Sequence, residues 1–442
     1  MSSWKQVRFS EICDITRGGS PRPIQEYMTN DGVPWIKISD ATASNSRFIE
    51  KTKEFIKTSG ISKSREVFPD DLILSNSATP GIPKFMRIYA CIHDGWLLLR
   101  NFNGAEKEFI YWLLLNERDK LIQQGNGSVF TNLKTDILKN HIVNIPDDIE
   151  EQKRIATILN NIQEKIELNT QINQTLEQIA QTIFKSWFID FDPVHAKANA
   201  LASGQTLEQA TQAAMAVISG KNTQELHRLQ TANLEQYQQL WEIAEAFPGG
   251  FDEEGVPRGW EERELSYLFE FLSGAQPPKS EHIYEEKEGY ERFIQNRDYS
   301  NDNHKTYIPI SKKNKRCTEK DILMDKYGEA GKVRYGIKGA YNVALAKIVP
   351  QKDNLREFLR SYFTQDKIRN YLSSSSMAST RNSLNSTTFT RMKVIVPNDF
   401  LLSTFDKLAN EKIDKILQIK QENIELSKLR DYLLPKLLSG EV

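Results

Sequence analysis

The sequence is poor in cysteine and lacks the motifs of the commonest enzyme classes. Its three cysteines, Cys13, Cys91 and Cys317, are scattered along 442 residues, which argues against a disulfide framework and a thiolate metal cage. The six histidines lack metal-ligand spacing, and neither a GxxxxGK[ST] phosphate loop nor a GxSxG motif is present. Residues 1–10 lack the apolar core of a secretory signal, and no apolar run is long enough for a membrane span. We therefore expect a cytoplasmic protein with no membrane contact that binds no metal or cofactor itself.

One string resembles the acidic cluster of a nuclease. It runs from Pro146-Asp147 to Glu151-Gln152-Lys153. These residues are also explained as a strand exit, a helix cap and a first helical turn, because Asp148 followed by Glu151 is a capping-box pattern. The sequence therefore predicts no catalytic residue.

The net charge hides an uneven distribution of charged residues. The total is -1, which argues weakly against nucleic acid as a partner. Residues 261–304, however, hold 5 basic and 11 acidic side chains, whereas residues 305–397 hold 19 basic and 7 acidic ones. A basic section can follow a phosphate backbone or form an ordinary solvated face, and charge alone leaves both interpretations open.

Residues 150–188 form the longest amphipathic segment. Apolar residues recur there at spacings of three and four, a heptad pattern that predicts a helix about 57 Å long with one apolar stripe. Such a stripe needs a partner helix, and residues 399–442 offer one. The predicted seam is Ile155, Leu159, Ile162, Ile166, Asn173, Leu176 and Ile183 in the first helix, and Ile416, Ile419, Asn423, Leu426 and Leu433 in the second. Asn173 aligns with Asn423, and we expect these buried polar residues to fix the register of the pair.

The two halves of the chain share one order of features, at an offset near 250 residues. Trp4 and Trp260 open the halves, residues 70–81 resemble residues 320–331, and each half ends in a long amphipathic helix. The repeat therefore predicts two copies of one α/β domain, each followed by a helix.

The predicted fold class is α+β, with two tandem α/β domains joined by two long helices. Short β-branched runs predict strands at 35–38, 72–74 and 141–145. The region rich in Ala, Gln and Leu between the halves predicts two or three connecting helices and a linker. The expected boundaries are 1–149 for the first globular domain, 150–192 for the first long helix, 193–259 for the connector, 260–398 for the second globular domain and 399–442 for the second long helix.

Loops that follow predicted strands, at 75–84 and 325–334, are candidates for contact with another chain. Their small residues allow close backbone approach, their basic residues can meet phosphates, and Asn or Thr can reach base edges. A second pair of polar loops lies at 125–132 and 373–383. Ordinary surface loops are the alternative for both pairs. The candidate DNA-binding residues are Arg17, Lys37, Asn76, Thr79, Lys84, Asn126, Ser128, Gln295, Asn296, Lys326, Tyr327, Lys332, Arg334, Arg381 and Asn382.

Several segments together resemble the specificity (S) subunit of type I restriction–modification systems. The most specific are IPDDIEEQKRIATILNNIQEKIELN at 145–169, SWFIDFDPV at 186–194 and SKLRDYLLPKLLSGEV at 427–442. The resemblance spans essentially the whole chain. It departs from the family pattern in an acidic loop before the first long helix and in a poor second copy of PWIKISD, residues 34–40.

The resemblance implies a non-catalytic subunit that addresses double-stranded DNA. Each globular domain would be a target-recognition domain that reads one half of an asymmetric bipartite site. The two helices would pair antiparallel, set the unread spacer and dock two methyltransferase (M) subunits. S-adenosylmethionine, ATP and Mg²⁺ would be used by the M and restriction (R) subunits of a prokaryotic complex. The alternatives are a stand-alone nuclease with an unrecognised site and a coiled-coil scaffold that binds no DNA.

Overall fold

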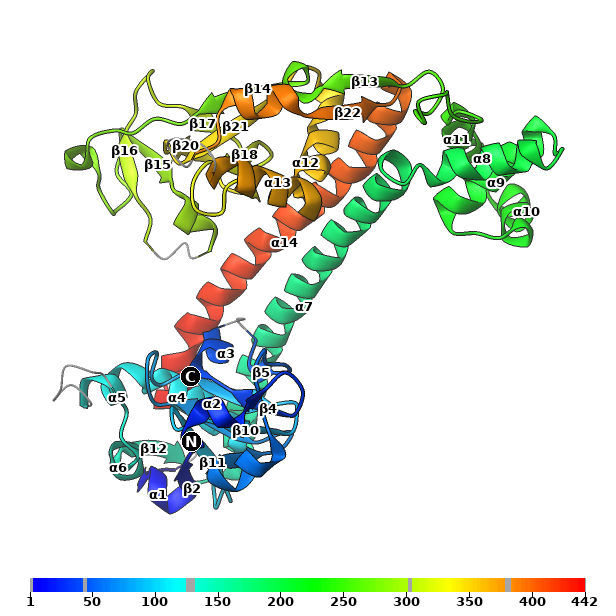
Figure 1. Cartoon of the computed structure of the whole chain (residues 1–442). Helices are drawn as coiled ribbons and strands as arrows, with labels where there is room; N and C mark the ends of the chain where they lie inside the picture. Colours follow the sequence, from blue (N-terminus) through cyan, green and yellow to red (C-terminus); the bar gives the residue numbers. More distant parts are fainter. Residues whose placement is uncertain (1–2, 43–45, 125–131, 301–303, 378–382, 442) are drawn as a thin grey trace. The chain divides into compact units, whose positions relative to one another are not determined.

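The computed structural model describes residues 3–42, 46–124, 132–300, 304–377 and 383–441. The chain divides into two units (Figure 1). Unit 1 comprises Met1–Thr170 and Gln421–Val442, and unit 2 comprises Gln171–Lys420. The long helices α7 (Ile149–Phe188) and α14 (Asp399–Ser439) contribute residues to both units.

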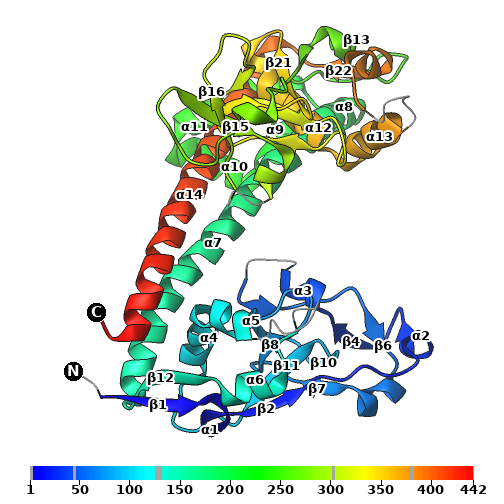
Figure 2. The same cartoon turned by 90° about the vertical axis from the view of Figure 1, so that its left-hand side faces the viewer.

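The described residues of unit 1 form one strand pair and two five-stranded sheets. Figure 2 shows β1 and β12 side by side. The pair is β1 with β12, one sheet has the order β2-β11-β8-β9-β5, and the other has the order β3-β6-β4-β10-β7. The strands are β1 Trp4–Arg8, β2 Asp14–Arg17, β3 Met28–Thr29, β4 Val33–Ile36, β5 Phe48–Ile49, β6 Phe55–Ile56, β7 Arg65–Val67, β8 Leu72–Ser75, β9 Pro83–Met86, β10 Ala90–Ile92, β11 Trp96–Arg100 and β12 Ile142–Pro146. The helices are α1 Phe9–Ile12, α2 Ile24–Tyr27, α3 Ile38–Thr42, η1 Thr58–Lys63, α4 Lys107–Asn116, α5 Arg118–Gln124 and α6 Thr135–Asn140.

Strand β8 is buried on both faces, which explains its uninterrupted apolar sequence. Leu72 and Leu74 belong to the core that includes α4 and the first turns of α7, whereas Ile73 belongs to the core between the two sheets. The predicted strand at 72–74 is confirmed. The predicted strand at 35–38 is wrong at its end, because Ile38 begins helix α3.

Unit 2 repeats this arrangement, which confirms the predicted duplication. Strand β13 pairs with β22, and the two four-stranded sheets have the orders β14-β21-β18-β19 and β16-β15-β20-β17. The strands are β13 Glu261–Glu264, β14 Phe269–Ser273, β15 Tyr290–Ile294, β16 Tyr307–Pro309, β17 Arg316–Cys317, β18 Ile322–Asp325, β19 Val333–Arg334, β20 Gly339–Tyr341, β21 Leu345–Pro350 and β22 Lys393–Val396. The helices of this repeat are η2 Leu265–Tyr267, η3 Lys279–Glu281, η4 Asn296–Tyr299, η5 Asp353–Leu355, α12 Arg356–Thr364, α13 Asp366–Met377 and η6 Ser386–Arg391.

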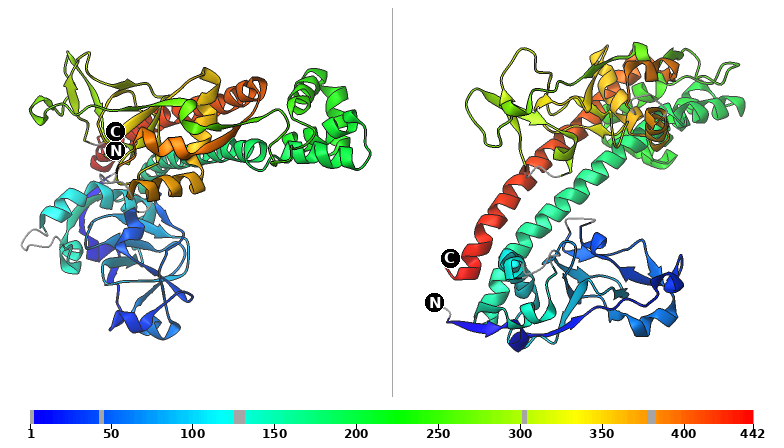
Figure 3. Two further views of the ribbon diagram at one scale, coloured as in Figure 1. Left: turned by 45° about the horizontal axis from the view of Figure 1, so that its top comes forward. Right: turned by 60° about the vertical axis from the view of Figure 1, so that its left-hand side comes forward.

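The connector of unit 2 forms four helices (Figure 3), of which α9, α10 and α11 share a small core of their own, while Val194 of α8 belongs to the main core of unit 2. The prediction of two or three connecting helices is therefore too low. They are α8 Asp192–Ala202, α9 Leu207–Ser219, α10 Thr223–Ala232 and α11 Leu234–Ala246. Thr206 and Asn222 cap α9 and α10 through capping boxes, which explains why helix begins again after each short break. Among the described helices, none is long and apolar enough to cross a membrane.

The predicted capping box of the first long helix is wrong in one part. Asp148 accepts a hydrogen bond from the Glu150 backbone N–H at 3.0 Å, as a helix cap does. Glu151 instead makes two hydrogen bonds to the Arg154 guanidinium, at 2.7 and 2.8 Å. The second helix begins in the same way, because Asn398 accepts from the Leu401 N–H at 2.9 Å.

The long helices pair antiparallel within unit 1. Arg430 of α14 donates to Gln163 of α7 at 2.7 Å, while Asn423, one heptad earlier in α14, meets Asn169 further along α7. The Asn169 amide donates to the Asn423 side-chain oxygen at 2.8 Å, and Asn423 in turn donates to the Ile166 carbonyl at 3.3 Å. Asn169, four residues before Asn173 on the same stripe, is therefore the residue that bonds to Asn423.

Other seam residues range from fully to partly buried. Ile155, Leu159, Asn173, Ile416 and Ile419 are buried. Half-buried members are Ile162, Ile166, Leu176, Ile183, Asn423, Leu426 and Leu433. In unit 2 the pairing ends in an aromatic cluster that the heptad pattern did not select. Its centre is Phe184, which is fully buried, 5.7 Å from Phe405 and 5.3 Å from Phe358 between ring centroids.

Candidate nucleic-acid interface

In unit 1 the backbone brings three separate loops together. The turn between β8 and β9 begins at Asn76, whose backbone N–H donates to the Gly95 carbonyl at 2.8 Å. The Asn76 carbonyl accepts from the Leu133 N–H at 2.8 Å. The predicted loop at 75–84 thus adjoins the β10–β11 turn and Leu133, which lies about 50 residues further along the sequence, whereas residues 125–131 of the other predicted loop lie outside the described residues.

Unit 2 repeats these contacts at equivalent positions. Lys326 replaces Asn76, and its N–H donates to the Ala344 carbonyl in the β20–β21 turn at 2.8 Å. The Lys326 carbonyl accepts from the Leu384 N–H at 3.2 Å. The chain therefore carries two copies of one loop edge, formed by the ends of strands from a buried sheet.

A glycine of each repeat makes the loop edge possible. A Cβ atom on Gly18 would lie 2.1 Å from the His93 carbonyl oxygen, and one on Gly274 would lie 2.1 Å from the Asn342 carbonyl oxygen. Both glycines immediately follow a strand, β2 or β14, and both oppose the turn that leads from one sheet to the other, β10–β11 in unit 1 and β20–β21 in unit 2. The absence of a side chain lets the loops pack against each other.

Asp94 in the β10–β11 turn, which sequence reasoning missed, connects several loops of unit 1. Its carboxylate accepts from the Ser20 hydroxyl at 2.6 Å, and its backbone carbonyl accepts from Arg17 Nε at 2.8 Å and from Asn76 Nδ2 at 3.2 Å. Burial tends to raise the pKa of Asp94, but Ser20, His93 and Arg17 together bring it below its usual value. A lone His-Asp-Gly turn is a common surface sequence, so only the fold reveals its role.

The predicted residues of unit 1 divide into exposed and buried groups. Arg17 keeps 59% of its side chain exposed. Thr79 is half-buried, and Lys37 forms an ion pair with Glu54. Asn76 and Lys84 are only 4% and 5% exposed. Burial lowers the pKa of Lys84 to about 8, and its ammonium group binds the Ser46 carbonyl.

Unit 2 shows the same division. Tyr327 is 39% exposed at the tip of the β18–β19 turn. Lys326 and Arg334 are buried, Lys326 bonded to the Ser273 hydroxyl at 2.9 Å and Arg334 to the Asp325 carboxylate at 2.8 Å. Lys332 forms an ion pair with Glu329 at 2.8 Å. These contacts give the three cations a structural role in the loop.

Four predicted residues, Asn126, Ser128, Arg381 and Asn382, lie outside the described residues. Gln295 and Asn296 are half-buried at the start of η4, where Gln295 donates to the Thr306 hydroxyl at 3.1 Å. At least nine of the basic residues between 305 and 397 form ion pairs with carboxylates. Much of the basic section is therefore neutralised in the fold, and its sequence charge overstates the positive surface.

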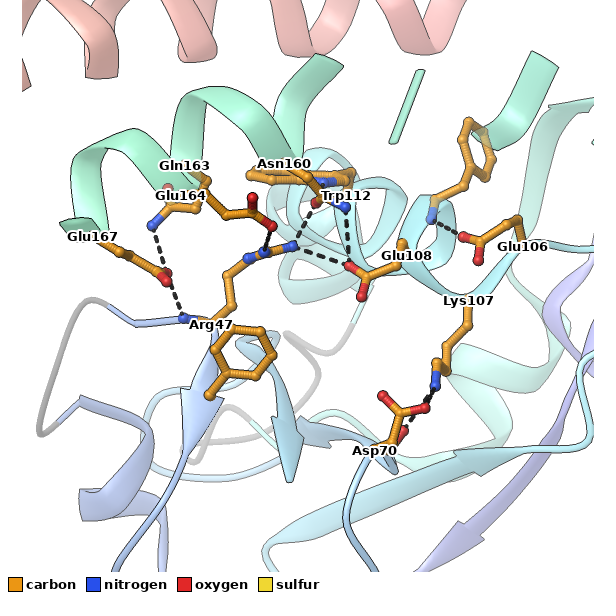
Figure 4. Close-up of polar contacts among 12 residues, drawn as sticks. Arg47, Asp70, Glu106, Lys107, Glu108, Trp112, Asn160, Gln163, Glu164 and Glu167 are labelled. Atoms are coloured by element: carbon orange, nitrogen blue, oxygen red, sulfur yellow. Dashed lines mark hydrogen bonds and ion pairs between the residues drawn. The ribbon is translucent and has the colours of Figure 1, made fainter. Parts of the chain in front are cut away.

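Arg47 fastens the loop before β5 to helix α7 (Figure 4). Its guanidinium is 2% exposed and contacts Glu108 of α4 at 3.0 Å, Asn160 of α7 at 2.5 Å and Glu164 of α7 at 3.0 Å. The Arg47 backbone N–H also donates to Glu167 at 3.1 Å. These contacts orient the globular part of unit 1 on its segment of α7.

The family model of the type I restriction modification DNA specificity domain matches residues 1–178 and 257–430. The chain belongs to this family. The two matched regions are the two repeats, each with part of its long helix.

Two relatives resemble the chain over nearly its whole length. The type I restriction enzyme HindI specificity subunit of Haemophilus influenzae is 33% identical over 473 residues, which cover 100% of both chains. The type I restriction enzyme MjaIX specificity subunit of Methanocaldococcus jannaschii is 26% identical over 458 residues, 99% of this chain and 93% of the relative. The crystal structure of the S subunit of the M. genitalium type I system has a TM-score of 0.53 at 15% identity, covering 99% of this chain and 96% of that one. That structure supports the α+β fold with two tandem domains.

Membership of this family makes the chain a DNA specificity subunit, which works with DNA and the other subunits of a type I system. Specificity subunits are generally non-catalytic, and the stand-alone nuclease and the scaffold that binds no DNA find no support. Among the described residues, no group of three or more His, Cys, Asp or Glu side chains is arranged to hold a metal ion.

Proposed function

We propose that each repeat of this specificity subunit reads one half of a bipartite, asymmetric DNA site. The observation that carries the proposal is the duplicated loop edge, with Asn76, Gly95 and Leu133 in one copy and Lys326, Ala344 and Leu384 in the other. Two copies of one backbone frame with different side chains suit the recognition of two different base sequences.

Within each edge, exposed side chains are the proposed DNA contacts. Arg17 and Arg22 in unit 1, with side chains 59% and 82% exposed, suit phosphates or guanine edges. In unit 2, Tyr327 is 39% exposed and is the proposed contact on that edge. Asn76, Lys84, Lys326 and Arg334 are proposed to support the loops instead, because their polar atoms already bind protein groups.

We further propose that the antiparallel helices set the spacer and dock two methyltransferase subunits. Helix α7 has 40 residues, so it is about 60 Å long, compared with about 34 Å for one turn of DNA. The M subunits would methylate adenine N6 with S-adenosylmethionine, R subunits would use ATP and Mg²⁺, and this chain would bind none of these. The complex would act in the cytoplasm of a prokaryote.

Exchange of one domain tests the assignment of one repeat to each half-site. Residues 1–149 are replaced by those of a relative, and methylated adenines are mapped by long-read sequencing in cells that carry the matching M subunit. We expect one half of the methylated motif to change and the other half to stay. The reciprocal exchange of residues 260–398 is the matched control and should change the other half. A change in both halves after either exchange would contradict the proposal.

A second experiment tests the loop residues. Arg17→Gln and Tyr327→Ala should each weaken binding of the complex to its cognate duplex by about tenfold in a titration at fixed salt, because each removes one specific contact. Arg154→Gln, which removes an exposed charge paired with Glu151 on α7, is the control and should leave affinity unchanged. Unchanged affinity in both loop variants would show that the loop edge is not the interface.

A further inference from the structure

Unit 2 contains a cavity of about 380 Å³ where α7, α12, α14 and β19 meet. This volume is at the small end of the range for ligand sites. The cavity adjoins the proposed DNA interface at Lys332, the last residue of the β18–β19 turn, but most of its lining residues come from the long helices, α12 and the segment around β19.

The cavity is lined by five cationic residues and two carboxylates, Glu177 and Glu357. Lys332, Arg334 and Arg360 already form ion pairs with carboxylates, so an added anion would depend on Lys420 and on the remaining donor of Arg360. Arg360 and Lys420 approach the same aromatic ring, that of Tyr335, at 4.6 and 4.4 Å from its centroid. Burial lowers the pKa of Lys420, with Glu177 opposing this effect and Arg360 adding to it. Two cations that contact one ring in a partly buried site favour an additional negative group beside them.

Two donors in these walls have no acceptor within the part of the chain that the structure describes. Arg360 is 4% exposed, and its Nε and Nη2 atoms bind Glu357 and the Lys320 carbonyl, yet its Nη1 atom is buried without a hydrogen-bond partner among the described residues. The hydroxyl of Tyr299 is in the same situation, and both residues line the cavity. An unpartnered buried donor costs free energy, and a bound ion or water is one of the explanations that proteins use.

We propose that this cavity binds a small free oxyanion of the phosphate type. The anion would accept hydrogen bonds from Arg360 and Tyr299 and neutralise Lys420. A phosphate within duplex DNA fits poorly, because its chain continues on both sides and the two donors are buried. Since the walls come from α7, α12, α14 and β19, an occupant would join the second globular domain to both long helices within unit 2. The three residues that would contact the anion, Arg360, Tyr299 and Lys420, are not among the proposed DNA contacts.

Titration with inorganic phosphate tests the proposal. The full chain is titrated without DNA at constant ionic strength, with chloride replaced by phosphate, and binding is followed by calorimetry and by the Tm of unit 2. Wild type should bind phosphate saturably and melt at a higher temperature. Tyr299→Phe and Lys420→Gln should each lower the affinity by about tenfold, as expected for loss of a hydrogen bond or a charge that contacts an anion.

Lys415→Gln is the matched control, because Lys415 is an exposed cation of α14 that does not line the cavity and bonds to Gln418. It should bind phosphate as wild type does. A Tm increase equal in all four proteins would mean a general salt effect and would overturn the proposal, as would the absence of saturable binding. Displacement of phosphate by duplex DNA would assign the cavity to the DNA backbone and refute a free anion as the occupant.

Discussion

Replacement of Arg47 by methionine should destabilise unit 1 selectively. The substitution keeps an apolar side chain of similar length but removes the guanidinium, which is 2% exposed and forms ion pairs with Glu108 and Glu164. Glu164 is 60% exposed, so its pair contributes about 0–1 kcal/mol. Glu108 is 30% exposed, and removing the partner of a buried charge costs about 3–5 kcal/mol.

Because Glu108 keeps some solvent contact, we expect the low end of that range, about 3 kcal/mol. In a unit of this size the loss corresponds to a Tm decrease of roughly 6–12 °C in the transition of unit 1. Calorimetry of the full chain measures it, and hydrogen exchange assigns the transition to β5 and α4. Arg154→Met, which breaks the exposed pair with Glu151, is the control and should cost less than about 1 kcal/mol.

The pH dependence gives an independent check. Burial raises the pKa of Glu108, and Arg47 opposes that effect, so the pKa should rise further in Arg47→Met. A carboxyl group whose pKa is raised in the folded state is favoured in its protonated form. The loss in free energy of unfolding of Arg47→Met, relative to wild type, should therefore be smallest below the pKa of glutamate in the unfolded chain. It should reach its full value above the raised pKa of Glu108 in the folded variant. Adding Glu108→Gln should recover part of the loss at neutral pH. A decrease of less than 2 °C, or a deficit that does not depend on pH, would refute this reasoning.

Three further outcomes are expected. Replacing both Asn169 and Asn423 by leucine should raise the Tm by a few degrees but make the register of the helix pair less specific. Disulfide cross-linking of cysteines introduced across α7 and α14 measures the register. A lower Tm with unchanged cross-links would contradict this prediction. Since the pKa of Lys84 is lowered to about 8, the folded state binds fewer protons than the unfolded state between pH 8 and 10.5. The free energy of unfolding of wild type should therefore rise with pH in this range relative to that of Lys84→Met. Parallel stability curves for the two proteins would contradict this prediction. Seven residues inserted in each long helix should lengthen the spacer of the methylated motif by about three base pairs, since one heptad adds about 10.5 Å; an unchanged motif would disprove the role of the helices as a spacer.

The heptads and the repeat made the architecture predictable. A period near 3.5 fixes a long helix from local sequence, and an offset of 250 residues exposes the duplication without knowledge of any contact. The register of α7 against α14 was harder to predict from the sequence. Asn169 and Asn173 lie four residues apart on one stripe, so either could face Asn423, and only the packing of the partner helix selects Asn169.

Loop residues were the least predictable. Asn76 and Lys84 have the composition of DNA contacts, but residues from other segments, Asp94 and Ser46, bury and bind them. Arg334 similarly meets Asp325 across the β18–β19 hairpin. Sequence identifies which side chains carry charge, whereas the pairing of distant segments determines which of these charges remain exposed.

The discontinuity of unit 1 has a consequence for biosynthesis. Its core needs Leu437 and Leu438 of α14 beside Ile155 and Leu159 of α7, so this unit includes residues that the ribosome adds after all of unit 2. Unit 2, residues 171–420, is contiguous and can close its core first. Until residues 421–439 emerge, the apolar stripe at the start of α7 stays uncovered and available to other proteins in the cell. Nascent chains are therefore expected to need a chaperone during that interval. The need arises from unit 1 alone, because only its core includes residues that are translated after unit 2.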